Sequence, residues 1–363
     1  MANLTKEHLD FFSTLGIKMH TGLEERKSYG HDETEDFVFP PDLVLIPTKT
    51  EEIASIMRYC NEHAIPVTPA GARTGLSGGC LPIHGGILVS MEKFNSILHI
   101  DTDNLQVTTE PGVITEVLQQ AVKEKGLFYP PDPASKGSCF IGGNVSENSG
   151  GPKAVKYGVT KDYVLNLEVV LPTGEIIWTG ANVLKNATGY NLTQLMVGSE
   201  GTLGIITKIV LRLLPHPTHD VLFLVPFFNA GSACAAVPDI FKAGIIPSGL
   251  EFMERDALLW TQQFSGDYTI AVKDNHAAHL LIEVDGQKYM AASTVDGTFN
   301  IAKVPVGKHQ LVASAAFYDS RTLTIEVTSG RELVLQIPLQ EKVSQQKDVR
   351  VVGRKQGEVL NEM

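Results

Sequence analysis

The spacing of apolar and polar residues changes several times along the chain and predicts a mixture of strands and helices. Short apolar runs bounded by prolines or turn residues predict strands at 42–47, 66–68, 86–90, 96–101 and 105–110. Apolar residues recur at helical spacing over 4–15, 50–60 and 115–125. Thr50 is expected to cap the second of these helices. The strand–helix–strand order over 42–68 predicts parallel strands joined by a right-handed crossover.

Later segments continue this mixture of predicted strands and helices up to about residue 284, and the pattern changes beyond residue 285. We expect an antiparallel hairpin from 163–170 and 175–179, and a long strand over 202–214 bent at Gly204. After a boundary at 215–217, the pattern predicts a strand at 221–227, helices near 230–243 and over 250–264, and a strand at 279–284. Beyond residue 285, alternating runs such as Leu333–Leu339 predict a small antiparallel sandwich, and residues 341–363 a flexible tail.

Composition narrows the class of protein. The chain has 363 residues, enough for two or three domains, and its 43% hydrophobic and 20% charged residues are typical of a globular protein. A formal net charge of −11 argues against nucleic acid as the main partner, because phosphate binding needs a basic surface. The four cysteines include no C-x-x-C pair, which favours a reducing compartment over a metal site or a disulfide framework. The N-terminal residues lack the apolar core of a signal peptide, so we expect a cytoplasmic protein.

Three glycine-rich stretches lie at 69–79, 137–158 and 198–204. Glycine at this density marks turns with positive φ or close approach of the main chain to a ligand, and unobstructed N–H groups can bind phosphate. The first stretch directly follows the predicted strand at 66–68, so a ligand at the carboxyl end of that strand would meet the loop. The first two stretches do not fit the standard phosphate-loop templates. Each alone is more often a tight turn, but together they predict one long phosphate-bearing ligand held by several loops.

Two histidines and an aspartate are candidates for chemistry, each with a structural alternative. His276 and His279 have the i, i+3 spacing of a metal pair on a helix, but their segment enters a predicted strand. Asp132 lies between two prolines and is a candidate base, with fixation of a turn as the alternative. We therefore assign no metal ligand and no catalytic residue, because a base must reach its substrate in space.

Four charged residues leave similar alternatives open. Glu254 and Arg255 are expected on a helix of the second domain, where a solvated face is the alternative to a substrate contact. Lys153 and Lys156 either offset phosphate charge or lie in a solvated loop. The sequence does not decide between these interpretations.

Five motifs, in this order along the chain, resemble the flavin domain of the vanillyl-alcohol oxidase superfamily. They lie at 68–79, 110–113, 131–133, 141–151 and 198–207. The most similar branch looks like the glycolate oxidase catalytic subunit and the FAD-dependent D-lactate dehydrogenases, and the resemblance covers about residues 10–285. It implies an α+β chain with a two-subdomain PCMH-type FAD-binding domain over 1–217 and a truncated α+β cap, which would hold the substrate, over 218–285.

The resemblance also implies which residues hold FAD. The 71–79 loop would bind the pyrophosphate through its N–H groups, residues within 131–158 would line the flavin and ribityl chain, and residues 200–206 would meet the adenine end. The implied set is Pro69, Gly71, Ala72, Arg73, Thr74, Gly75, Ser77, Gly78, Gly79, Pro111, Gly112, Pro131, Asp132, Ser138, Gly142, Gly143, Asn144, Asn148, Ser149, Gly150, Gly151, Tyr157, Gly158, Glu200, Gly201, Gly204, Ile205 and Ile206.

The implied activity is oxidation of a small 2-hydroxy acid, such as glycolate or D-lactate, with hydride passing from the substrate Cα to flavin N5. The electron acceptor is unknown, and a homo-oligomer and a redox partner subunit both stay open. In this family the second half of the cap also supplies an arginine and a lysine for the substrate carboxylate, and a histidine-rich motif followed by Gly-Asp-Gly-Asn. That half of the cap has no counterpart in this sequence. Residues 286–340 instead resemble part of a carboxypeptidase regulatory-like (transthyretin-like) sandwich. The alternative hypothesis is therefore an FAD-binding but catalytically impaired fusion or truncated protein.

Overall fold

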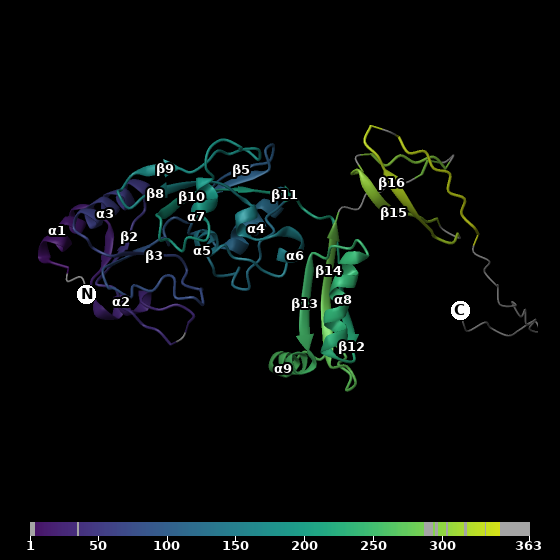
Figure 1. Ribbon diagram of the computed structural model, residues 1–363, viewed down its shortest axis with the longest axis horizontal. Coiled ribbons are helices and arrows are strands. Elements are labelled where there is room, and N and C mark those ends of the chain that lie inside the picture. The colour runs from purple at the N-terminus through teal and green to yellow at the C-terminus, as the bar shows by residue number, and fades with distance from the viewer. Residues whose placement is uncertain are drawn as a thin grey trace, which may run out of the picture. The chain divides into compact units, whose positions relative to one another are not determined.

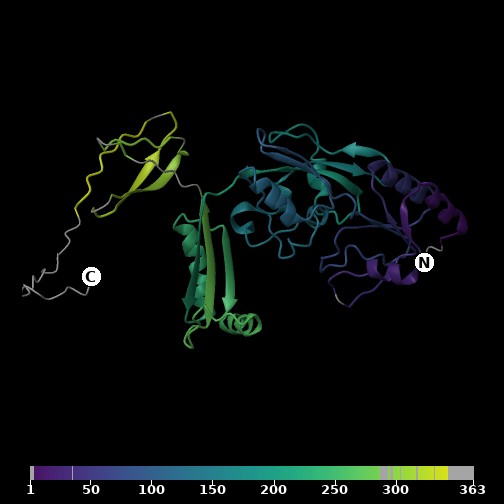
Figure 2. The same cartoon turned by 180° about the vertical axis from the view of Figure 1, so that it is seen from behind.

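The computed structural model describes residues 4–34, 36–286, 293–294, 297–302, 304–315, 318–330 and 332–341. The chain divides into two compact units between Gln287 and Lys288 (Figures 1 and 2). The predicted tail lies outside the described residues, except for its first residue, Glu341. Among the described residues, no helix is both long and apolar enough to cross a bilayer.

The first sheet of unit one contains the strands on which the first glycine loop is built. Its order is β1-β2-β4-β3, with β1 at Lys18–His20, β2 at Leu43–Ile46, β4 at Ile87–Ser90 and β3 at Val67–Ala70. β2 and β3 both run parallel to β4, and β1 pairs antiparallel with β2. The predicted parallel strand–helix–strand unit is confirmed, and β4 lies between its two strands. The first glycine loop therefore begins at the carboxyl end of a parallel strand.

The helices that accompany this sheet are α1 (Lys6–Thr14), α2 (Leu23–Tyr29) and α3 (Thr50–Glu62). Ile53, Ile56 and Cys60 are buried along the apolar face of α3, as its spacing predicts. The predicted cap is wrong by one residue, because Thr50 is the first helical residue and Lys49 is the N-cap. The carboxylate of Glu52 accepts the N–H of Lys49 and so satisfies the start of the helix.

The second sheet is antiparallel throughout, in the order β5-β6-β10-β8-β9. Its strands are β5 (Ile97–Asp101), β6 (Gln106–Thr109), β10 (Ile205–Arg212), β8 (Val164–Val170) and β9 (Ile176–Trp178). The predicted hairpin of β8 and β9 is confirmed. The long strand predicted from residue 202 begins only at Ile205. A side chain on Gly204 would come within 2.8 Å of the carbonyl oxygen of Val170, so the chain passes β8 closely there.

Short elements complete this domain: α4 (Thr115–Lys123), β7 (Leu127–Phe128), α5 (Ile141–Glu147), α6 (Ala154–Tyr157), a 3-10 turn (Thr160–Asp162), α7 (Leu192–Met196) and β11 (Leu214–Pro215). The second glycine-rich stretch was expected as a loop but contains α5 and α6. Ile141 and Val145 of α5 are fully buried in the core beside the second sheet, and this burial holds a glycine-rich segment in a helix.

The rest of unit one is a three-stranded antiparallel sheet in the order β12-β14-β13, with two helices. These elements are β12 (His219–Phe227), α8 (Ala230–Lys242), β13 (Gly249–Glu254), α9 (Arg255–Ser265) and β14 (Ala278–Gly286). The helix predicted over 250–264 is wrong in its first part. Leu250 and Phe252 pair with Ile282 and Leu280 of β14, and this pairing makes the segment a strand.

The described residues of unit two include one antiparallel pair of strands, β15 (Gly307–Ala313) and β16 (Arg321–Val327). The alternating segment Leu333–Leu339 forms no strand, although Leu335, Ile337 and Leu339 are less exposed than their neighbours. The small sandwich stays a prediction.

Candidate cofactor site

A cleft in unit one is lined by parts of all three glycine-rich stretches. It holds about 580 Å³ of space not filled by atoms, a figure that includes space open to solvent. Its lining residues are Pro69, Ala70, Gly71, Gly79, Cys80, Met91, Pro111, Gly142, Gly143, Ser146, Glu147, Glu200, Gly201, Gly204, Ile205 and Ile206. The loop after β3, the first turn of α5 and the entry to β10 are distant in the sequence and meet here.

A second hollow shares part of its wall with this cleft. The shared residues are Pro69, Gly201, Gly204 and Ile205, and the second hollow contains about 610 Å³ of empty space. It continues to Met57, Cys60, Asn61, Ile65, Val67, Pro172 and Thr202. Because the two hollows adjoin, their combined space suits an extended ligand better than a compact one.

The main chain of the first glycine loop carries unused hydrogen-bond donors. None of the N–H groups from Gly71 to Cys80 donates to another residue in the described part of the chain. The loop is instead held through its carbonyl groups, because Gly75 O accepts from Glu33 N at 3.1 Å and Gly78 O accepts from Leu81 N at 3.1 Å. A run of unpaired N–H groups is the chemistry that binds phosphate oxygens. The loop therefore fits the pyrophosphate of a dinucleotide.

Arg73 adds a cation beside the same loop. Its φ is +60°, and its guanidinium carbon lies 4.7 Å from the centre of the Tyr29 ring. Its Nε atom is buried and has no hydrogen-bond partner among the described residues. A guanidinium with a buried, unused donor atom also fits an anionic ligand.

Two carboxylates face the loop, and their negative charge opposes the positive potential of the N–H groups and of Arg73. A β-carbon placed on Gly79 would lie 3.0 Å from Glu147 Oε1 and 3.2 Å from Glu200 Oε2. Ser77 Oγ donates to Glu147 Oε2 at 3.4 Å. Burial, with the nearby Glu200 carboxylate, raises the pKa of Glu147. A bound phosphate would have to share the cleft with these acids.

Sequence reasoning missed five residues that line the cleft: Ala70, Cys80, Met91, Ser146 and Glu147. Met91 follows β4, whose carboxyl end lies at the same sheet edge as that of β3, so parallel pairing was the signal for it. Ala70 and Cys80 adjoin residues already expected. Ser146 and Glu147 had no local signal, because they reach the cleft only through the helical turn of α5.

The cleft includes eleven of the predicted cofactor residues: Pro69, Gly71, Gly79, Pro111, Gly142, Gly143, Glu200, Gly201, Gly204, Ile205 and Ile206. It does not include Ala72, Arg73, Thr74, Gly75, Ser77, Gly78, Gly112, Pro131, Asp132, Ser138, Asn144, Asn148, Ser149, Gly150, Gly151, Tyr157 or Gly158. Their cofactor contacts stay predictions, and some have visible structural roles. The Gly112 N–H donates to Phe94 O at 2.7 Å, and the buried Asn144 amide donates to Thr115 Oγ1 at 2.5 Å.

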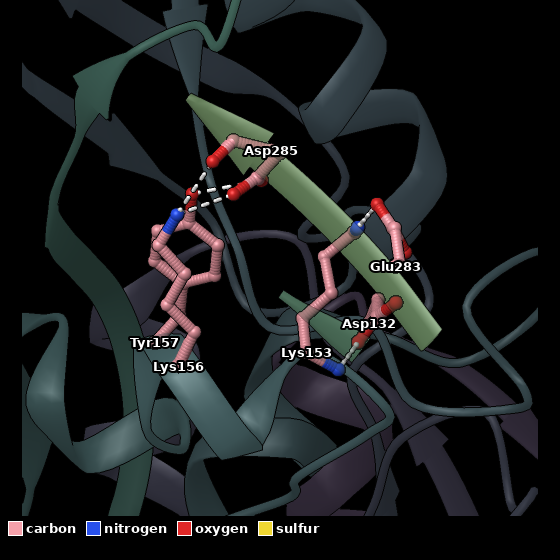
Figure 3. Close-up of polar contacts among 6 residues, drawn as sticks. All are labelled: Asp132, Lys153, Lys156, Tyr157, Glu283 and Asp285. Atoms are coloured by element: carbon pink, nitrogen blue, oxygen red, sulfur yellow. Dashed lines mark hydrogen bonds and ion pairs between the residues drawn. The ribbon is translucent and has the colours of Figure 1, made fainter. Parts of the chain in front are cut away.

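Residues 153–157 form a charged cluster with β14 (Figure 3). Lys153 pairs with Glu283, and Lys156 Nζ lies 2.5 Å from Asp285 Oδ1. Tyr157 donates its hydroxyl proton to Asp285 Oδ2 at 2.8 Å. Neither interpretation of the two lysines included this pairing of each ammonium group with a carboxylate of β14, and their role beside phosphate stays a prediction.

Asp132 lies beside the same cluster. Its Oδ1 accepts from the main-chain N–H of Lys153 at 3.2 Å. Burial raises the pKa of this carboxyl, while that N–H and the charges of Lys153 and Lys136 act in the opposite direction. The contact supports the turn-fixing interpretation of Asp132.

His276 and His279 lie close together at the start of β14, with ring centroids 6.0 Å apart. Both Nδ1 atoms are buried without a hydrogen-bond partner in the part of the chain that the structure describes. Burial and the neighbouring His276 lower the pKa of His279. Within the described ranges, no group of three or more histidine, cysteine, aspartate or glutamate residues could hold a metal ion.

Comparison with known families agrees with this geometry. Residues 41–180 match the family described as FAD binding domain, and residues 216–334 match FAD linked oxidases, C-terminal domain. These two matches identify FAD as the cofactor of the chain, which is similar to FAD linked oxidases. The second match continues past residue 285, where the sequence was expected to leave the cap. The resemblance of residues 286–340 to a transthyretin-like sandwich has no support from these matches.

Several curated proteins are similar to the chain. The glycolate oxidase subunit GlcD of Bacillus subtilis is 46% identical over 261 residues, which are 72% of this chain and 55% of that protein. A D-lactate dehydrogenase of Anaerostipes hadrus is 43% identical over 265 residues, 72% of this chain and 56% of that protein. The chain thus spans about half the length of the curated relatives it matches. A solved structure of alkyldihydroxyacetonephosphate synthase has the same fold, with a TM-score of 0.68 and 20% identity, covering 78% of this chain and 56% of that one.

Proposed function

We propose that this chain is an FAD-dependent oxidoreductase that oxidises small 2-hydroxy acids such as glycolate or D-lactate. The observation that carries the proposal is the loop from Gly71 to Cys80, which borders the cleft and whose N–H groups have no hydrogen-bond acceptor among the described residues. The names of its relatives, glycolate oxidase subunit and D-lactate dehydrogenase, support the substrate class.

The two adjoining hollows suggest how the chain would hold FAD. The N–H groups of the first glycine loop would bind the pyrophosphate, with Arg73 as a nearby cation. The hollow that reaches Met57 and Pro172 would take one end of the extended molecule, and the cleft beside Gly142 and Gly143 would take the rest. FAD supplies the hydride acceptor, and the protein supplies its placement.

The chain's own contribution to catalysis is therefore binding and orientation. Uncharged main-chain groups would hold the dianionic pyrophosphate, with the carboxylates of Glu147 and Glu200 nearby. The apolar residues Ile205 and Ile206 line the same cleft and restrict water around the cofactor. No residue is proposed as the base that accepts the hydroxyl proton.

The proposal is tested with the purified full chain, loaded with FAD and kept free of oxygen. We expect a yellow protein whose visible flavin absorption bleaches when D-lactate or glycolate is added. L-lactate serves as the control for stereochemistry, and dithionite shows that the bound flavin can be reduced. A protein that neither copurifies with FAD nor binds added FAD would contradict the proposal at its first step.

The alternative function, an FAD-binding protein without turnover, gives a different result. Its flavin would stay oxidised with every 2-hydroxy acid and still bleach with dithionite. The sequence feature that favours it is the absence from these 363 residues of the family's histidine-rich motif. The electron acceptor, a homo-oligomeric or partner-bound state and a cytoplasmic location stay predictions.

A further inference from the structure

Two lysines beside the second glycine-rich stretch contact two carboxylates on one strand. Lys153 is the N-cap of α6 and Lys156 lies within that helix, and Glu283 and Asp285 are two positions apart on β14. Side chains two apart on a strand share a face and lie about 6.6 Å apart, so each lysine can meet its own carboxylate. Figure 3 shows the two pairs side by side.

The two pairs differ in burial and in the number of bonds. The Asp285 side chain is 3% exposed, and it accepts from Lys156 Nζ and from the Tyr157 hydroxyl. Lys156 Nζ also donates to the main-chain oxygen of Asp285 at 3.0 Å. The Lys153–Glu283 pair has one contact, and both side chains are at least 20% exposed. Asp285 is therefore the more firmly held of the two carboxylates.

The cluster continues from α6 to the Asp132 turn. A β-carbon on Gly151 would lie 2.2 Å from the main-chain oxygen of Asp132, so the two segments are in close contact. The N–H of Lys153 donates to Asp132 Oδ1 at 3.2 Å. Residues 131–133, residues 150–157 and β14 thus form one continuous set of contacts. The first two of these segments are predicted to line the flavin.

We propose that Asp285 is a positioning residue for the flavin-facing wall: by binding Lys156 and Tyr157, it fixes residues 150–157 and, through them, the Asp132 turn. The inference rests on the proposed function and on the prediction, implied by the family resemblance, that residues within 131–158 line the flavin. Neutralising Asp285 leaves the Lys156 ammonium beside a buried site without its counter-charge, and the lysine then turns toward water. Residues 150–157 and the Asp132 turn, which form the flavin-facing wall, then become more mobile, although Asp285 itself does not contact the cofactor.

The main test compares Asp285→Asn with Asp239→Asn. Asp239 forms an exposed pair with Lys242 on α8, so its substitution is a matched control. Hydrogen exchange is measured for the peptides that cover 150–158 in the FAD-free protein. We expect Asp285→Asn to raise the exchange rate there at least tenfold and the control to leave it unchanged.

Two further measurements concern the cofactor. We expect Asp285→Asn to raise the Kd for FAD about tenfold and to change the visible circular dichroism of the bound flavin. General destabilisation does not alter that spectrum in the folded, loaded protein. Tyr157→Phe removes only one hydrogen bond, so we expect a smaller increase in Kd, about two- to threefold, with the same spectral change.

A double variant separates pairing from simple loss of stability. Lys156→Met together with Asp285→Asn removes both partners, and we expect less exchange at 150–158 than with Asp285→Asn alone. If Asp285→Asn does not fold, this double variant and Tyr157→Phe still test whether the contacts of Asp285 hold residues 150–157 in place.

Unchanged exchange at 150–158 in folded Asp285→Asn would overturn the inference, and so would a double variant as perturbed as the single one. Failure of the wild-type chain to bind FAD would instead overturn the proposed function. In that case the exchange measurement on the FAD-free protein still decides whether Asp285 holds the wall.

Discussion

Glu168 Oε1 accepts a hydrogen bond of 3.1 Å from the hydroxyl of Thr50, and this contact joins β8 of the second sheet to the first residue of α3 beside the first sheet. The same oxygen accepts from Thr207 Oγ1 at 2.9 Å, and Glu168 Oε2 lies 2.9 Å from Lys208 Nζ. Glu168 is only 7% exposed. A carboxylate buried to this extent is stable only with such partners, so it fixes the two parts of the FAD-binding domain against each other.

We therefore expect Glu168→Gln to destabilise the protein. Replacing the carboxylate weakens hydrogen bonds to a charged group and leaves buried hydroxyls poorly paired, at a cost of about 1.5–3 kcal/mol. The measurement is urea unfolding of the FAD-free protein, because bound FAD would add its own stabilisation. Glu175→Gln is the control, since among the described residues the Glu175 carboxylate accepts only from Thr173, at the surface, and its substitution should change stability by less than about 0.5 kcal/mol. Equal effects of the two substitutions would contradict the role given to Glu168.

The helices and strands whose apolar residues follow a single clear spacing were predictable from the sequence. β2 is a fully buried apolar run, and α3 has apolar residues at helical spacing, so both follow from local pattern. α5 was not predictable, because Gly142 and Gly143 disfavour a helix. It forms because Ile141 and Val145 are buried and because its first N–H groups bond to carbonyls outside the helix, those of Val113 and Pro111.

The difference between local sequence signals and contacts made only in the folded chain also explains how much of the candidate site could be predicted. The 69–79 loop was found from its glycines and from its place after β3, both of which are local signals. Glu147 was missed because only the helical turn of α5 brings it beside Gly79. The pairing of Lys156 with Asp285 joins residues 129 positions apart, and nothing in the local sequence indicates it.

Gly143 offers a test in which stability and cofactor affinity change in opposite directions. It lies inside α5 and lines the cleft, and apart from its chain neighbours and the helix's own backbone no atom lies within 4 Å of the position a β-carbon would occupy. Gly143→Ala should stabilise the helix by roughly 0.5–1 kcal/mol. Its methyl group should also occupy cofactor space and raise the Kd for FAD about tenfold.

Thermal unfolding of the FAD-free protein and quenching of flavin fluorescence measure these two effects. Gly231→Ala in α8 is the control, because it makes a comparable helix substitution at a residue that does not line the cleft. We expect it to leave the Kd unchanged. If Gly143→Ala binds FAD as tightly as the wild type, FAD does not contact the first turn of α5.

Glu147 should make both stability and FAD affinity depend on pH. Its pKa is raised by burial and by Glu200, so the folded state favours the protonated form. The stability that the proton contributes is complete below the unfolded-state pKa of about 4.5 and is lost as the pH rises through the raised value. Glu147→Gln should therefore gain stability relative to the wild type at pH 7 and not at pH 4.

The same substitution should tighten FAD binding at pH 7. A carboxylate about 8 Å from a phosphate repels it by roughly 0.5 kcal/mol in a watery cleft, which corresponds to about a two- to threefold decrease in Kd. Glu124→Gln, an exposed glutamate at the end of α4, is the matched control and should change neither quantity. A Kd that rises on Glu147→Gln would show that Glu147 donates or accepts a contact to FAD instead of repelling it.

Cys80 provides an independent measurement of where FAD binds, because its thiol lines the cleft. Burial raises its pKa from an ordinary 9.0 to about 11, so about a hundredfold less thiolate is present than for an unperturbed thiol. Iodoacetamide at pH 8 should therefore modify Cys80 far more slowly than the exposed Cys234 of α8, as followed by mass spectrometry of the two peptides.

Saturating FAD should slow the modification of Cys80 at least a further tenfold, because a dinucleotide across the 71–79 loop covers the thiol. Cys234 should react at the same rate with and without FAD, which makes it an internal control in every sample. Changes in overall stability affect both cysteines, whereas occupancy of the cleft affects only Cys80. If the protein is yellow and saturated while Cys80 still reacts at its FAD-free rate, the cofactor lies outside this cleft. The unpaired N–H groups after Gly71 would then need a different anion.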